Sequence, residues 1–144
     1  MCIWTDGWDG YPMARQRLFD ALYKSKARNP LILSGDVHSF FAAEIGRYPT
    51  RERSKVNPVL ATEFCGTSVT SPSRPQKRTD EFVAINPSIM YGKSDQRGYM
   101  LLTITPAATT TRFLGLNDVH NAGSAIATAA SFVVRDGRPG LNRA

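Results

Sequence analysis

The stretch LILSGDVHSFF, residues 31–41, decides the fold. Its first four residues have the character of a buried strand, and Gly35 and Asp36 follow as turn residues. In an open α/β sheet, ligands bind at the carboxyl ends of the strands. Asp36 and His38 come directly after the strand, so the same stretch predicts both a sheet and a site.

The rest of the chain supplies the other elements of an α/β protein. Residues 12–28 have apolar side chains at helical spacing, with Pro12 in the first turn, which predicts an amphipathic helix. The run PVLATEFC, residues 58–65, predicts a second buried strand. The later β runs are GYMLLTITP (98–106), TTRFLGLNDV (110–119) and ASFVVRDG (130–137), and the first two are expected to form a hairpin. This order predicts an α/β protein with a mixed sheet whose later strands are antiparallel, and the number of strands allows a large sheet.

The composition bounds the class of protein. A chain of 144 residues with 42% apolar and 21% charged residues fits one globular domain. No run approaches the ~20 apolar residues that span a bilayer, so no membrane span is expected. The start, MCIWTDGWDGYP, lacks the basic and apolar regions of a secretory signal, and no signal peptide is expected in this chain.

The charge favours anionic partners. Eighteen Lys and Arg against twelve Asp and Glu give a net charge of +6. Much of the excess falls in two predicted loops, RYPTRERSK (47–55) and RPQKR (74–78). Neither has interleaved aromatic residues or the pattern of a recognition helix, so nucleic-acid binding is unsupported. The alternatives are a solvated surface and a non-catalytic basic α/β module that binds polyanions.

The residues Asp36 and His38 carry the clearest chemistry. Two positions apart on an extended segment, their side chains would point the same way. An Asp oxygen and a His imidazole suit two adjacent metals of different character. Two metals about 3.5–4 Å apart are the usual arrangement for in-line displacement at phosphorus. The alternative is that Asp36 caps the segment that follows and His38 is a core residue.

Other polar residues near the motif have open roles. Glu63 lies in a strand among apolar residues, where a carboxylate needs a partner, either as support for a metal site or in a structural ion pair. Thr67 and Ser68 could hydrogen-bond a phosphate, although Gly-Thr-Ser is also turn chemistry. Cys2 and Cys65 match no disulfide framework or zinc motif, and Cys65 is expected to be buried.

A series of segments then suggests a family. In order along the chain they are WDGYPMARQRL, LILSGDVHSFF, ATEFCGTSVTS, NPSIMY followed by RGY, and SFVVRDGRPG. From about Trp8 to Gly140, this series resembles the C-terminal part of PhoD-like alkaline phosphatases, a branch of the calcineurin-like metallophosphoesterases. The resemblance implies a layered α/β sandwich, hydrolysis of phosphate mono- and diesters, a site with Fe³⁺ and Ca²⁺, and a periplasmic or extracellular location.

The resemblance also assigns residues. Related metallophosphoesterases have G-H-x-H at this point. Here the first histidine is replaced by Asp36, which the PhoD-like pattern assigns to Ca²⁺, and His38 would bind Fe³⁺. Calcium takes oxygen ligands, so the replacement makes chemical sense. Family members carry an upstream half with the other ligands. Residues 1–144 are therefore expected to be the C-terminal part of one metallophosphatase-like domain, active if the N-terminal half completes it.

Overall fold

The computed structural model describes residues 7–48, 52 and 54–144. A 3-10 turn, Trp8–Gly10, precedes the first helix, α1 (Pro12–Ser25). The second helix, α2 (Gln76–Ile85), lies between the third and fourth strands along the chain. Neither helix is long and apolar enough to cross a membrane. The strands are β1 (Leu31–Ser34), β2 (Phe40–Gly46), β3 (Val59–Cys65), β4 (Ile89–Lys93), β5 (Arg97–Ile104), β6 (Ala108–Leu116), β7 (Ile126–Arg135) and β8 (Arg138–Arg143).

The strands form two sheets of four. The first has the order β1-β3-β2-β4, with β1 parallel to β3 and the other pairs antiparallel. The second is antiparallel throughout, in the order β5-β6-β7-β8, and includes the expected β5–β6 hairpin. The expected α/β fold with antiparallel later strands is confirmed. The strands divide into two sheets of four and bury their apolar faces by packing sheet on sheet, which gives the expected layered arrangement.

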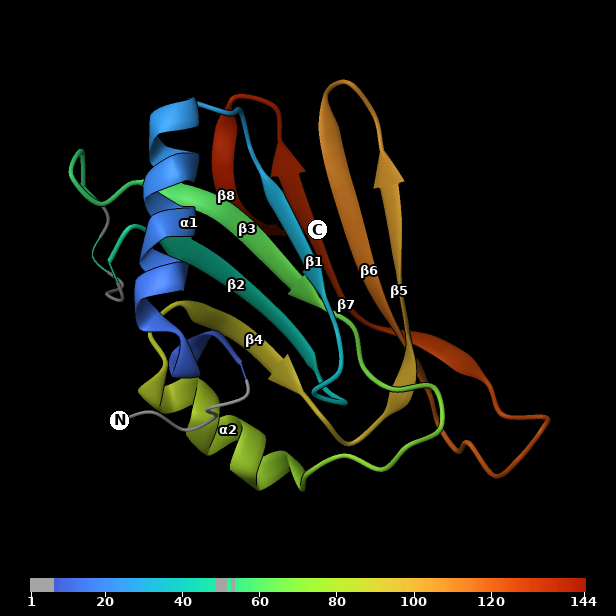
Figure 1. Cartoon of the computed structure of the whole chain (residues 1–144). Coiled ribbons are helices and arrows are strands. Elements are labelled where there is room, and N and C mark those ends of the chain that lie inside the picture. Colours follow the sequence, from blue (N-terminus) through green and yellow to red (C-terminus); the bar gives the residue numbers. More distant parts are fainter. Residues whose placement is uncertain (1–6, 49–51, 53) are drawn as a thin grey trace.

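The layers are plain in Figure 1. Helix α1 crosses one face of the first sheet, and the second sheet covers the other face. Helix α2 packs beside β4, where Gly92 permits close approach. A Cβ at that position would lie 2.7 Å from a methyl of Val83 and 2.9 Å from the ring of Phe41. The glycine therefore lets α2 lie close against β4.

An aromatic cluster joins the two sheets. Phe40 and Phe64 from the first sheet meet Phe113 and Phe132 from the second, and all four are buried. The rings of Phe40 and Phe113 stack at 4.8 Å between centroids, and those of Phe113 and Phe132 meet edge to face at 5.9 Å. Tyr91 of β4 packs against the same cluster. The core therefore lies between the sheets, and α1 contributes no buried residue to it.

The predicted elements agree with the structure in part. The strand over residues 31–34 is confirmed, and the helix predicted to residue 28 ends at Ser25. The prediction of a loop over RPQKR is partly wrong, because α2 begins at Gln76 within this run. Strands β2, β4 and β8 were not predicted. Residues 49–51 and 53 of the predicted loop over residues 47–55, and Cys2, lie outside the described residues.

Candidate functional site

The loop between β1 and β2 carries Asp36 and His38. Strand β3 lies between β1 and β2, so residues 35–39 must cross over the carboxyl end of β3. The crossing requires bends, and both residues have positive φ, 71° at Asp36 and 54° at His38. Asp and His tolerate this conformation better than most residues. The expectation of an extended segment is therefore wrong.

Both side chains nevertheless line one open groove at the carboxyl ends of β1 and β3. The opposite wall comes from the segment before α2 and from α2 itself. Asp36 is exposed and His38 is half-buried. The remaining lining residues are Val37, Pro72, Ser73, Arg74, Arg78, Glu81, Phe82 and Ile85. The groove therefore brings two carboxylates, an imidazole and two guanidinium groups together.

One hydrogen bond fixes which ring nitrogen of His38 carries the proton. Its Nδ1 lies 3.0 Å from the carbonyl oxygen of Pro72. A carbonyl oxygen only accepts, so Nδ1 carries the proton and donates. In the neutral imidazole the Nε2 lone pair is then left for another partner. Metal-binding histidines show this arrangement, with one ring nitrogen donating to a carbonyl and the other binding the metal.

The arginines add positive charge to the opposite wall. The guanidinium carbon of Arg74 lies 5.8 Å from the centroid of the Phe82 ring, which holds it by a cation–π contact. Arg78 lies one turn into α2 and is exposed. Guanidinium groups match the oxygens of a phosphate in geometry and charge. Sequence reasoning missed this wall. The signal was the charge run followed by EFVAI, in which Phe82 and Ile85 recur at helical spacing.

The other predicted site residues, Glu63, Thr67 and Ser68, do not line the groove. Glu63 faces α1 and accepts a hydrogen bond of 2.7 Å from the Ser34 hydroxyl. The Thr67 hydroxyl donates to the carbonyl oxygen of Gln96 at 3.3 Å. The Ser68 hydroxyl donates to the carbonyl oxygen of Ser71. These contacts are within the protein, and the predicted roles of all three residues toward a metal or phosphate stay predictions.

Cys65 is buried, as expected. Burial raises the pKa of its thiol from 9.0 to about 11, and nearby Glu63 and Asp36 add to the effect. The hydrogen bond with Ser34 acts in the opposite direction. A metal would need the thiolate, which this environment disfavours.

The groove offers two side-chain donors of the kinds that bind metals, Asp36 and His38. Among residues 7–48, 52 and 54–144, no group of three or more His, Cys, Asp or Glu side chains lies close enough to hold a metal ion. Calcium takes six to eight ligands and other metals at least four. The donor types of Asp36 and His38 fit the two metals that the family resemblance implies. Two donors are too few, so a metal ion held here would need further ligands.

Comparison with known proteins now adds to this geometry. Residues 1–113 match the family model described as PhoD-like phosphatase. The chain belongs to the PhoD-like phosphatase family. It is 35% identical, over 141 residues, to alkaline phosphatase D of Bacillus subtilis (strain 168), and it covers 24% of that protein. The solved structure of PhoD matches 96% of this chain with a TM-score of 0.79 and 29% identity, over 26% of its own chain.

The matches confirm the family that the sequence segments suggested. They also agree with the layered fold, since the structural match extends over nearly all of the chain. This chain spans about a quarter of the length of the relatives that it matches.

Proposed function

We propose that this chain contributes two metal ligands to a phosphoesterase of the alkaline phosphatase D type. The observation that carries the proposal is the groove in which Asp36, His38 with its free Nε2, and two arginines come together. The family membership adds the class of reaction, hydrolysis of phosphate mono- and diesters.

The residues have separate roles in this proposal. Asp36 offers its carboxylate to Ca²⁺, and His38 offers Nε2 to Fe³⁺. The Pro72 carbonyl oxygen keeps the proton on Nδ1 and so holds the ring in the binding tautomer. Arg74 and Arg78 attract and orient the anionic ester. When bound, the metal ions would polarise the phosphoryl oxygens and stabilise the charge that develops in the transition state.

The proposal also includes the context of the chain. Residues 1–144 form the C-terminal part of one metallophosphatase-like domain, and a segment outside them supplies the remaining ligands. The phosphate ester is the substrate, and the location is periplasmic or extracellular, as in the family resemblance. The two donors of the described residues and the one-quarter coverage of the relatives support this context.

The test is hydrolysis by the product of the gene that encodes this chain, with any coding sequence upstream included. We expect turnover of bis(p-nitrophenyl) phosphate that is lost on chelation. Asp36→Asn and His38→Gln should each reduce turnover by at least about 100-fold, since even partners of metal ligands cost 10–100-fold. Glu52→Gln, outside the groove, is the matched control. Near-normal turnover in both ligand variants would refute the assignment.

A further inference from the structure

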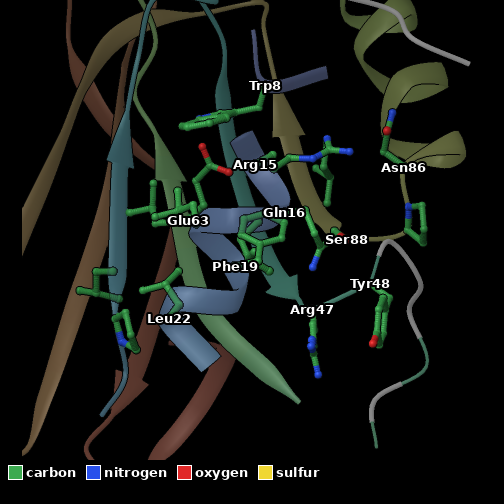
Figure 2. A pocket seen from close by; sticks show the side chains of 18 residues that line it. Trp8, Arg15, Gln16, Phe19, Leu22, Arg47, Tyr48, Glu63, Asn86 and Ser88 are labelled. Atoms are coloured by element: carbon green, nitrogen blue, oxygen red, sulfur yellow. The ribbon is translucent and has the colours of Figure 1, made fainter. Parts of the chain in front are cut away.

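A second cavity lies on the other side of the first sheet, under α1 (Figure 2). Its volume is about 430 Å³, within the usual range for small-molecule sites. The apolar part of its wall comes from α1 and from the helix-facing side of the sheet. It includes Phe19, Leu22, Ile32, Ile45 and Ile89. The cavity exists because α1 buries no residue of its own against the sheet.

A space of this size is costly if it stays empty. Empty apolar space destabilises a fold, because the atoms that line it lose van der Waals partners. Contact with solvent lowers the cost, but an apolar occupant that replaces poorly held water is favoured.

The charges in the wall select the kind of occupant. Arg15 lies 2.6 Å from Asp9, and Arg47 lies 3.1 Å from Asp20, so both arginines are neutralised. Glu63 instead receives a neutral hydroxyl, that of Ser34. In the part of the chain that the structure describes, no cation forms an ion pair with Glu63. Its carboxylate is therefore the uncompensated charge of this wall.

An aromatic side chain stands beside that carboxylate. Trp8 lies at the mouth of the cavity, and Figure 2 shows the Glu63 carboxylate directed toward its ring. The Trp8 side chain is 54% exposed, so one part of it faces solvent and another the cavity. A carboxylate next to an indole face is the combination that binds organic cations, by charge and by cation–π attraction.

We propose that this cavity binds a small organic amine with an apolar or aromatic body. The ammonium group pairs with Glu63 and lies against Trp8, while the body enters the apolar space beside Phe19 and Leu22. This site is separate from the Asp36–His38 groove and goes beyond the proposed phosphoesterase function. The test of this proposal measures binding alone, so its outcome is independent of whether the protein hydrolyses phosphate esters.

The test is calorimetric titration of the same gene product, any coding sequence upstream included, with three probes of similar size. They are phenethylamine, the neutral 2-phenylethanol and the anionic 3-phenylpropionate. We expect saturable binding of the amine with a Kd of about 1 mM or below. The alcohol should bind about tenfold more weakly and the carboxylate more weakly still. Equal binding of amine and alcohol, preference for the carboxylate, or no saturable amine binding would each overturn the proposal.

Variants distinguish the effect of the Glu63 charge from the effect of the cavity volume. Glu63→Gln keeps an amide oxygen that accepts the Ser34 hydroxyl, and it should weaken amine binding about tenfold and leave the alcohol unchanged. Leu22→Trp fills the cavity and should remove binding of both. Glu81→Gln makes the same charge change on the exposed surface of α2 and should have no effect.

A last variant keeps the test decisive if Glu63→Gln fails to fold. Trp8→Leu changes an exposed side chain at the rim, and it should weaken the amine several-fold but not the alcohol. Amine binding that is indifferent to this change would overturn the proposed cation site.

Discussion

The backbone at Asp36 and His38 is strained, and this is the property of single residues that most sets the site apart. Residues with positive φ other than glycine cost about 1–3 kcal/mol each and persist where the surrounding structure or a function holds them. Here the crossing over β3 explains the conformation, which glycine would adopt without strain.

This argument predicts a gain in stability when function is removed. Asp36→Gly should leave the free energy of unfolding unchanged or raise it by up to about 1 kcal/mol, because glycine adopts φ near 71° without strain. Asp36→Val places a β-branched residue there and should lower it by about 1–3 kcal/mol. Thermal unfolding of both variants checks this. Equal losses in the two would show that the carboxylate itself stabilises the loop.

The Cys65 thiol gives a prediction on pH. Because burial raises its pKa to about 11, the folded protein keeps a proton that the unfolded chain loses above its ordinary value of 9.0. Stability should therefore fall as the pH rises from about 9 to about 11. In a Cys2→Ser background, dithiobis(nitrobenzoate) at pH 8 should label the native protein far more slowly than the unfolded one. Rapid labelling of native protein would contradict the burial.

At the scale of elements, helix α1 is held weakly at its ends. Tyr11 at its N-cap makes no side-chain capping bond, and Lys26 at its C-cap is left-handed, with φ 54°. Glycine is the preferred residue in that conformation. A substitution at Lys26 can therefore stabilise the last turn of α1 without changing the lining of the Asp36–His38 groove or of the cavity under α1.

Lys26→Gly should raise the free energy of unfolding by about 0.5–1 kcal/mol, since it removes the strain of a left-handed lysine. The matched control is Lys24→Gly inside α1, which should lower stability by about 1 kcal/mol. Thermal unfolding should show shifts of opposite sign, each of about 2–4 °C. Shifts of the same sign would contradict the assigned end of the helix.

The elements also show what the sequence could predict. Strand β1 was predictable because it is a short apolar run bounded by Pro30 and Gly35. Strand β2, FFAAEIG, was not, because its Ala and Glu are poor strand formers and only pairing with β3 and β4 on both sides holds it extended. Residue type and spacing were enough to single out Asp36 and His38 as candidates, and the structure places both in one groove. Their positive φ, and the arginines opposite them, depend on the path of the chain between distant elements.

At the scale of the whole molecule, the two sheets depend on one aromatic cluster. Phe113 contacts Phe40, Phe64, Tyr91 and Phe132, and its side chain is fully buried. Phe113 therefore lies at the centre of the aromatic cluster that packs the two sheets together.

Phe113→Ala should lower the free energy of unfolding by about 3–5 kcal/mol, the usual cost of removing a buried Phe ring. Tyr99→Ala on neighbouring β5, where the ring is 47% exposed, should cost about 1 kcal/mol or less. Denaturant unfolding of the two variants distinguishes them. Similar losses would mean that the sheets are not joined through Phe113.

The central claim is that Asp36 and His38 bind different metals of one phosphoesterase centre. The most direct measurement is the iron and calcium content of the purified gene product and of its Asp36→Asn and His38→Gln variants. The account predicts that Asp36→Asn loses calcium first and that His38→Gln loses iron first, while both variants stay folded. Two folded variants that keep the full content of both metals would contradict it.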